Sequence, residues 1–186
     1  MLQSRKELKE ILKYEQSINF GNKDVMGCLL EMAKNSNKWM TWKYIRSLRV
    51  TGYHYQNHRC SLYHSIMYIV WSRRKNSLGR KLGIELGHKT FDKGLTIYHS
   101  QGIVVNGNCK IGKNCKLHGN NCIGNDGYSD GVPVLGDNVR LGVGAKVIGE
   151  ITIANNTVIA AGAVVVKDIK KEGTTVAGIP ARIIGE

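Results

Sequence analysis

The C-terminal half of the chain carries an aliphatic residue at every sixth position. Counted from Val105, ten of the eleven positions are Val, Ile or Leu. The series is Val105, Ile111, Leu117, Ile123, Ser129, Leu135, Leu141, Val147, Ile153, Ile159 and Val165. A helix has a period of 3.6 residues and a strand a period of 2, so neither produces this spacing. A hexapeptide repeat is typical of a parallel β-helix.

Small residues accompany the repeat. Gly112, Gly124, Gly136 and Gly142 each follow one of the aliphatic residues directly. Each unit is expected to form one short strand, with its aliphatic side chain inside, and one tight turn that a glycine accommodates without a Cβ clash. Stacked coils would then pair each backbone N–H and C=O group with the coil above or below.

Ser129 is the one interruption, and it lies in a polar, glycine-rich stretch over residues 125–131. We interpret this stretch as a loop extruded from the β-helix. Loops on a rigid scaffold often carry function. A tolerated bulge is the alternative interpretation.

Residues 1–82 show helical spacing instead. Three apolar series are present: Val25, Leu29, Met32 and Ala33; Trp39, Trp42 and Ile45; and Leu62, Ile66, Ile69 and Val70. The third is followed by the basic run 73–75, which suits a helix C-terminus. We therefore expect an α-helical N-terminal region over residues 1–82 and a mainly β domain over residues 83–186.

The charge of the chain is unevenly distributed. The net charge is +13, and residues 1–90 hold 17 Lys and Arg residues against 6 Asp and Glu residues. A basic half can meet anionic lipid, nucleic acid or an anionic substrate, or it can simply form solvated helix faces. No nucleic-acid-binding motif accompanies the charge, so no nucleic-acid partner is expected.

Cysteine usage and hydropathy bear on the compartment. The five cysteines form no CxxC pattern, which favours free thiols in a reducing compartment. The N-terminus has no apolar signal-peptide segment, and the apolar stretch 65–71 is too short to cross a bilayer. These features predict a soluble cytoplasmic protein.

Three blocks resemble the hexapeptide-repeat acyltransferases, and within them the serine acetyltransferase-like branch. They lie at residues 94–106, 133–149 and 177–185, and the last, AGIPARIIG, resembles the C-terminal signature of these enzymes. The resemblance implies a left-handed parallel β-helix, acetyl-CoA as donor and a hydroxyl as acceptor. It also implies a homotrimer with active sites between neighbouring β-helices. Two trimers associate through N-terminal helices in this branch, but the helical part is shorter here.

The resemblance assigns catalytic roles. Transfer to a hydroxyl requires a base, and His99 in the GLTIYH block matches the catalytic histidine of the family. His99 also falls in the six-residue register, so a structural histidine is the alternative. An upstream acid orients the base in the family, which implies Glu85, or otherwise Asp92. His118 is a further catalytic candidate, and an exposed turn histidine is the alternative.

The same resemblance assigns binding residues for acetyl-CoA: Asn125, Gly144, Ala145, Ala161, Gly162, Lys167 and Arg182. Backbone N–H groups near Asn125 would stabilise the oxyanion, and the small residues would line the pantetheine arm. Lys167 and Arg182 would meet the phosphates or be plain surface charge. No metal-ligand spacing is present, so no metal is expected.

Two departures from the serine enzymes bear on the acceptor. Gly131-Val132 stands where those enzymes carry an arginine and a second histidine, and Tyr98 replaces the acid before the catalytic histidine. A tyrosine suits a sugar ring. We therefore expect sugar O-acetylation in surface-polysaccharide biosynthesis (capsule, exopolysaccharide or O-antigen). L-serine O-acetylation in cysteine biosynthesis is the alternative, and a non-catalytic scaffold is a third hypothesis. A peripheral contact with membrane or a lipid-linked glycan would suit the basic half.

Overall fold

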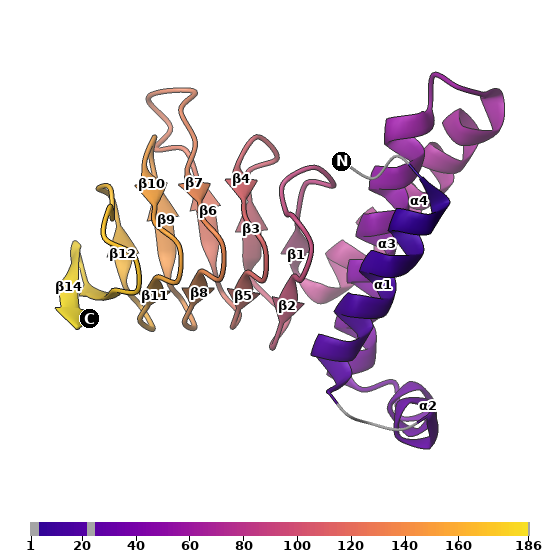
Figure 1. The fold of residues 1–186 in the computed structure, drawn as a ribbon, viewed down its shortest axis with the longest axis horizontal. Helices are drawn as coiled ribbons and strands as arrows, with labels where there is room; N and C mark the ends of the chain where they lie inside the picture. The colour runs from indigo at the N-terminus through magenta and orange to yellow at the C-terminus, as the bar shows by residue number, and fades with distance from the viewer. Residues whose placement is uncertain (1–3, 22–24, 186) are drawn as a thin grey trace.

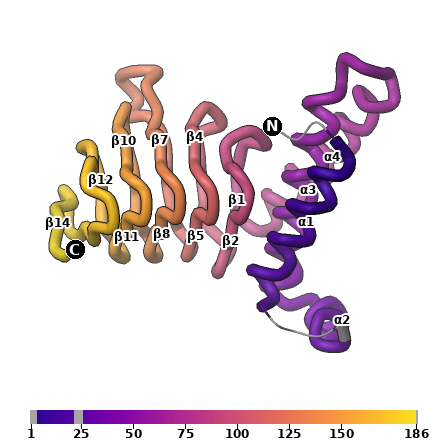
Figure 2. Tube along the Cα trace, viewed as in Figure 1, coloured from indigo at the N-terminus to yellow at the C-terminus, as the bar shows by residue number. Residues whose placement is uncertain are grey.

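The computed structural model describes residues 4–21 and 25–185, with helices at one end and stacked coils of strands at the other (Figure 1). The helices are α1 (Arg5–Phe20), α2 (Val25–Ala33), α3 (Asn37–Asn57) and α4 (Leu62–Leu82). Serine side chains cap three of them, because Ser4, Ser36 and Ser61 each accept a hydrogen bond from a backbone N–H in the first turn. In Figure 2 the trace winds away from the helices one coil after another.

The strands form three sheets, one on each side of the coil. The strands are β1 (Ile84–Glu85), β2 (Thr96–Ile97), β3 (Ile103–Val105), β4 (Lys110–Ile111), β5 (Lys116–Leu117), β6 (Cys122–Gly124), β7 (Val134–Leu135), β8 (Arg140–Leu141), β9 (Lys146–Ile148), β10 (Thr152–Ile153), β11 (Val158–Ile159), β12 (Val164–Val165), β13 (Thr175–Gly178) and β14 (Ala181–Gly185). Sheet A has the order β1-β3-β6-β9-β12, sheet B the order β10-β7-β4, and sheet C the order β14-β13-β11-β8-β5-β2.

The aliphatic series forms the core of the coil. In sheet A, Val105 pairs with Ile123, Ile123 with Val147, and Val147 with Val165, all in parallel register. These side chains are at most 3% exposed, so one column of aliphatic residues runs along the axis. The predicted left-handed parallel β-helix with a helical N-terminal region is thereby confirmed.

The polar stretch at Ser129 forms an extruded loop. Ile123 and Leu135 are successive inward residues, yet twelve positions separate them instead of six. Between them Tyr128 is 98% exposed. The Asp126 carboxylate accepts hydrogen bonds from the backbone N–H groups of Tyr128 and Ser129, which lower its pKa. The insertion leaves the coils on either side in register.

The helices differ in how they meet the core. Trp42, Ile45 and Leu48 of α3 are buried in the same hydrophobic cluster as the first coils. The apolar series of α4 has its helical spacing, but Leu62, Ile66, Ile69 and Val70 are all exposed. This helix therefore presents an apolar face to its surroundings.

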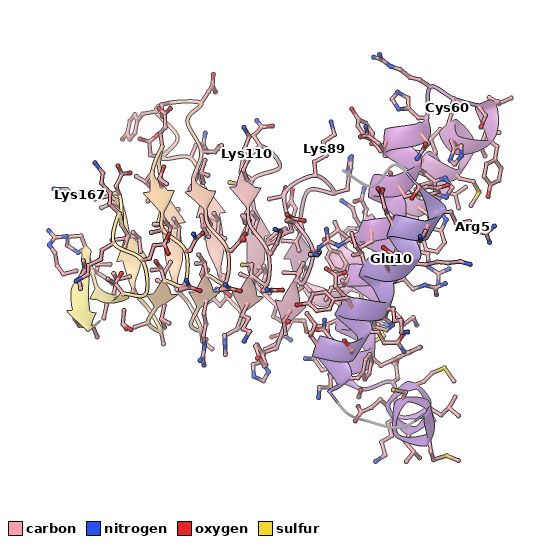
Figure 3. The ribbon with its side chains drawn as sticks, in the orientation of Figure 1. Arg5, Glu10, Cys60, Lys89, Lys110 and Lys167 are labelled. Atoms are coloured by element: carbon pink, nitrogen blue, oxygen red, sulfur yellow. The ribbon has the colours of Figure 1, made fainter. Side chains whose placement is uncertain are left out.

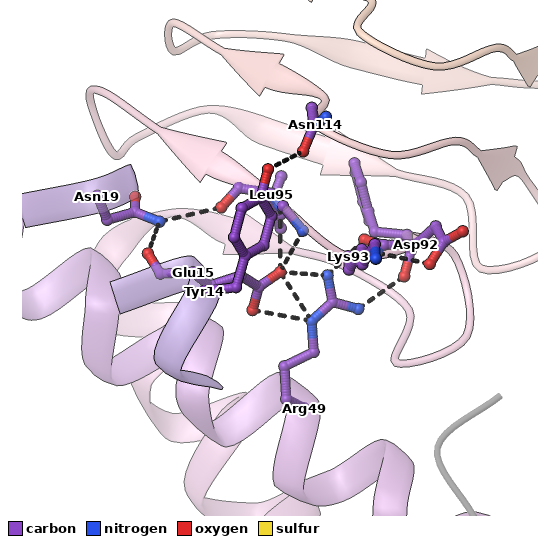
Figure 4. Close-up of polar contacts among 10 residues, drawn as sticks. Tyr14, Glu15, Asn19, Arg49, Asp92, Lys93, Leu95 and Asn114 are labelled. Atoms are coloured by element: carbon purple, nitrogen blue, oxygen red, sulfur yellow. Dashed lines mark hydrogen bonds and ion pairs between the residues drawn. The ribbon is translucent and has the colours of Figure 1, made fainter. Parts of the chain in front are cut away.

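A buried ion pair joins the helices to the first coil (Figure 4). Arg49 of α3 donates to the Glu15 carboxylate of α1 at 2.6 Å from Nη2 and 3.1 Å from Nε. The same carboxylate accepts the backbone N–H groups of Gly94 and Leu95, and Arg49 also donates to the carbonyl of Phe91. Both side chains are at most 5% exposed. Every charge in this junction therefore has partners, as a buried charge requires.

Each end of the coil is closed differently. At the N-terminal end α1 packs against β2 of the first coil, and its Tyr14 hydroxyl donates to Asn114 of the second coil at 2.7 Å (Figure 4). At the C-terminal end β14 runs antiparallel to β13, against the direction of the rest of sheet C. Within the described residues, no helix combines the length and apolar character that crossing a membrane requires.

Candidate active site

Most of the residues assigned from the sequence lie on one edge of the β-helix. Four turns lead from sheet C to sheet A, at residues 98–102, 118–121, 142–145 and 160–163. They stack directly, because Gly144 donates its N–H to the Gly119 carbonyl and Gly162 donates to the Val143 carbonyl. We call this edge the histidine corner, since it contains His99 and His118.

His99 does not occupy the aliphatic register. Ile97 pairs with Leu117 in sheet C, and Val105 pairs with Ile123 in sheet A, so Ile97 and Val105 occupy the aliphatic register of the first two sheets that the chain joins here. The spacing between them is eight residues instead of six. The two additional residues push the turn outward and leave His99 exposed. The alternative of a structural histidine in an aliphatic slot is therefore wrong, and the side chain is accessible to a substrate.

His99 rests on the next turn of the histidine corner. A Cβ atom built on Gly119 would lie 3.3 Å from the Cβ atom of His99. Gly119 has a φ of 111°, in the region that side chains rarely adopt. A glycine here therefore provides both the turn conformation and the room for His99.

His118 lies in a stack with two neighbours. Its ring lies 4.4 Å from the Tyr98 ring at an interplanar angle of 23°. On the following coil, Arg140 donates from Nε to His118 Nε2 at 3.1 Å. Burial, followed by the charges of Arg140 and His99, lowers the pKa of His118. Because Nε2 accepts this hydrogen bond, His118 is neutral and cannot take a substrate proton at that nitrogen.

A residue of the helical region holds the backbone on both sides of His99. Asn37, at the start of α3, donates to the Tyr98 carbonyl at 3.2 Å and accepts from the Ser100 hydroxyl at 2.8 Å. The sequence gives no indication of this contact, because Asn37 follows the capping residue of a helix that lies 61 positions away from Tyr98.

The two proposed acidic partners of His99 each line a cavity beside the helices. Glu85 points outward from β1 in sheet A and lines a cavity of about 560 Å³ with Lys75 and Arg80 of α4. Asp92 caps the backbone N–H of Lys93 and lines a second cavity of about 440 Å³. His99 lies in the turn that leads from sheet C to sheet A, and Glu85 lies on β1 of sheet A, where it pairs with Val104. The orientation of His99 by Glu85 therefore stays a prediction.

The small residues of the histidine corner differ in which way they face. Gly144, Ala161 and Gly162 are half-buried or exposed, and a Cβ atom on Gly162 would meet nothing within 4 Å. Ala145 is 0% exposed, with its methyl group in the hydrophobic core. The assignment of all four residues to turns that line the pantetheine arm stays a prediction.

The remaining assigned residues lie elsewhere. Asn125 follows β6, where sheet A turns toward sheet B, and its side-chain amide is taken up by the Ser129 carbonyl. Lys167 is exposed at the C-terminal end of the coil (Figure 3), and Arg182 is exposed on β14. Strands of one sheet lie about 4.8 Å apart, so Lys167 is roughly three spacings along the axis from the coil of His99. The corner thus runs from His99 toward these cations.

His99 lines neither the cavity beside Glu85 nor the one beside Asp92. The histidine corner lies on the outside of the β-helix, where a single chain encloses it on one side only. Among the residues the structure describes, no group of three or more His, Cys, Asp or Glu side chains is placed to hold a metal ion.

Comparisons by sequence and by structure both find serine acetyltransferases. No protein-family model matches the chain. The serine acetyltransferase of Synechococcus elongatus is 38% identical over 94 residues, which are 50% of this chain and 38% of the relative. That of Bacillus subtilis is 31% identical over 132 residues, 65% of this chain and 60% of the relative. The chain therefore spans about half the length of these curated relatives.

Solved structures agree on the fold. The serine acetyltransferase of Brucella abortus in complex with coenzyme A has a TM-score of 0.75 at 26% identity, covering 98% of this chain and 69% of that one. The serine acetyltransferase of Vibrio cholerae has a TM-score of 0.74 at 20% identity, covering 97% of this chain and 66% of that one, and shows the likeness of fold alone.

These findings correct the expected acceptor. The relatives are named serine acetyltransferases, so the expectation of a sugar in surface-polysaccharide biosynthesis is wrong, and the alternative is better supported. The structure adds a physical reason, because one face of the Tyr98 ring, offered as a platform for a sugar, is already covered by His118. Fold and relatives together support the assignment of this chain to the hexapeptide-repeat acetyltransferase family.

Proposed function

We propose that the chain is an acetyl-CoA-dependent O-acetyltransferase that uses L-serine as acceptor and His99 as general base. The likeness to serine acetyltransferases over at least half of the chain carries this proposal. The placement of His99 supports it, because an exposed histidine lies at the start of a row of small residues along which a thin thioester arm could extend.

In the proposed reaction, a ring nitrogen of His99 removes the proton of the serine hydroxyl as its oxygen attacks the thioester carbonyl. The new C–O bond forms a tetrahedral intermediate, which collapses as the C–S bond breaks. The proton held by His99 then passes to the leaving thiolate, which gives free coenzyme A. The backbone N–H groups of Gly119, Gly144 and Gly162 already donate within the chain, so the oxyanion needs other donors.

The test is the release of coenzyme A thiol in the presence of acetyl-CoA and L-serine, with O-acetylserine identified by mass spectrometry. His99→Ala should lower kcat by about 10²- to 10⁴-fold, the usual contribution of a general base. His58→Ala, in the hairpin between α3 and α4, is the matched control. Absence of O-acetylserine from the wild-type reaction would refute the proposed acceptor. Acetyl-CoA binding without turnover of any acceptor would favour the scaffold hypothesis.

The same proposal includes a homotrimer, in which a neighbouring β-helix covers the open side of the histidine corner. Light scattering coupled to size-exclusion chromatography measures the mass directly, and it separates a trimer from a dimer of trimers. A monomer with full activity would contradict this arrangement. A cytoplasmic location stays a prediction.

We propose separately that the exposed apolar face of α4 makes a peripheral contact with an anionic membrane surface. Leu62, Ile66 and Ile69 are 76%, 51% and 58% exposed on one side of the helix. The second half of α4 adds Arg73 and Arg74, and the helix contains no acidic residue. Apolar side chains followed by cations on one helix suit a bilayer interface with anionic headgroups.

Vesicle sedimentation tests this contact. The protein should bind phosphatidylglycerol vesicles and not phosphatidylcholine vesicles, and binding should weaken between 50 and 300 mM salt as charges are screened, a roughly tenfold change being expected. Ile66→Ser combined with Ile69→Ser should abolish binding, while Ser77→Ala on the same helix should not. Concentration-dependent self-association that disappears in the double variant, without vesicle binding, would overturn the proposal.

A further inference from the structure

The stack formed by Tyr98, His118 and Arg140 lies beside the proposed base. Arg140 pairs with Lys116 across sheet C, and Lys116 pairs with Thr96, so the three lie in one row across neighbouring coils. Arg140 and Lys116 point outward, because their neighbours along each strand are the buried inward residues. His118 lies between Arg140, which donates to its Nε2, and Tyr98, which stacks on its ring and directly precedes the proposed base.

The guanidinium of Arg140 is held in place without being neutralised. Its Nε donates to His118 Nε2 at 3.1 Å, and the imidazole is itself fixed by stacking on Tyr98. An imidazole that accepts at Nε2 is neutral, so it orients the arginine and leaves its charge intact. Among the described residues, no Asp or Glu forms an ion pair with Arg140.

Most surface arginines are mobile and gain little from their contacts. Arg140 differs because one edge of its guanidinium is immobilised, while its two Nη groups have no hydrogen bond to the described protein. The free edge of a guanidinium matches the two oxygens of a carboxylate, and fixing it beforehand reduces the entropy lost on binding. The geometry is that of a preorganised anion site beside a general base.

We propose that Arg140 binds the α-carboxylate of the amino-acid acceptor, with His118 as the positioning residue for its guanidinium. This inference rests on the proposed function, since it names how that site recognises its acceptor. The resembling enzymes carry an arginine at the place of Gly131-Val132, and this chain does not. In our proposal Arg140 of β8 binds the carboxylate of the acceptor instead. An anion of the same chemistry occurs in the phosphates of coenzyme A, and the experiment separates the two sources.

The test compares Arg140→Gln with the wild-type enzyme, varying L-serine and acetyl-CoA separately. The KM for L-serine should rise by about 10- to 100-fold, the usual effect of losing hydrogen bonds to a charged group. The KM for acetyl-CoA should change less than twofold. Lys116→Gln, in the same row, is the control and should leave the KM for L-serine within about threefold. A rise in the KM for acetyl-CoA alone would assign Arg140 to the phosphates and overturn the proposal, as would no change in either KM.

Two further measurements distinguish a failure of this inference from a failure of the proposed function. L-Serinamide lacks the carboxylate, so the wild-type enzyme should discriminate strongly against it and Arg140→Gln should not. His118→Phe keeps a ring against Tyr98 but removes the acceptor of the Arg140 Nε hydrogen bond, and it should raise the KM for L-serine with little effect on kcat. If the wild-type enzyme makes no O-acetylserine, the proposed function fails. In that case the NMR signal of Arg140 Nε is followed while L-serine is titrated, and no shift means that the carboxylate site fails as well.

Discussion

Replacement of Arg49 by Met tests whether the junction between the helices and the first coil depends on a fully paired buried charge. In the wild-type protein the Glu15 carboxylate is 0% exposed and receives Arg49 together with the N–H groups of Gly94 and Leu95. Met fills much of the arginine volume but donates no hydrogen bond. The variant therefore leaves a buried carboxylate with two backbone donors and no counter-charge.

The expected cost follows from these contacts. Removing one partner of a buried ion pair destabilises a protein by about 3–5 kcal/mol. The carbonyls of Phe91 and Asp92 also lose their donors, each worth about 1 kcal/mol. Together these costs predict a loss of about 6 kcal/mol in the free energy of unfolding, which is a large part of the roughly 5–15 kcal/mol of a typical domain. For a chain of this length the melting temperature should fall by about 12–24 °C.

Urea unfolding at fixed protein concentration, followed by circular dichroism, measures the change. Arg46→Met on the exposed side of the same helix is the control and should stay within about 0.5 kcal/mol. The double variant Arg49→Met with Glu15→Leu should recover part of the loss, because apolar replacement of a whole buried pair is nearly neutral, although the N–H groups of Gly94 and Leu95 then lose their acceptor. A cost below about 1 kcal/mol for Arg49→Met, or no recovery in the double variant, would refute the reasoning.

Three other predictions concern single side chains. Asn37→Ala should lower kcat about tenfold with both KM values and the melting temperature nearly unchanged, because it frees the backbone around His99; an unchanged kcat would contradict this role. Burial lowers the pKa of His88 to about 4, below an unfolded value near 6.5, so stability should be lost as the pH falls through that window, by about 2 kcal/mol between pH 7.5 and pH 5. His88→Phe should flatten this dependence in denaturant titrations, and an equal slope in the variant would exclude His88 as its source. Burial raises the pKa of Cys115 to about 12, whereas Cys60 is exposed, so iodoacetamide at pH 8 should modify Cys60 and spare Cys115 in the native protein, as peptide mass spectrometry would show.

The hexapeptide register was sufficient to predict the fold, because every inward position of the coil has the same physical requirement. Only a branched aliphatic side chain fills the stacked column, so the pattern survives with little noise from Val105 to Val165. The same regularity gives a wrong position for His99. Ile97 and Val105 are both inward although eight residues separate them, and counting in sixes from Val105 places His99 inside by mistake.

The candidate site was harder to predict because its residues meet across coils. Arg140 and His118 are 22 positions apart and form their hydrogen bond only when β5 and β8 are adjacent. Glu85 has a suitable chemistry and a suitable distance along the chain from His99, but whether the two side chains meet depends on how sheet C joins sheet A. Neither local propensity nor spacing carries that information, so the pairing of polar side chains had to come from the stacked structure.

The two closed ends of the coil have a consequence for solubility. A strand edge with free N–H and C=O groups is a template for another chain, and a stack of parallel coils with bare ends could grow into a fibre. Here α1 contacts β2 and α4 contacts β1 at the first coil, and the reversed strand β14 ends sheet C. Removing residues 181–185 should therefore convert discrete particles into end-to-end polymers. The C-terminal strand β14 thus protects the edge of sheet C against pairing with another molecule.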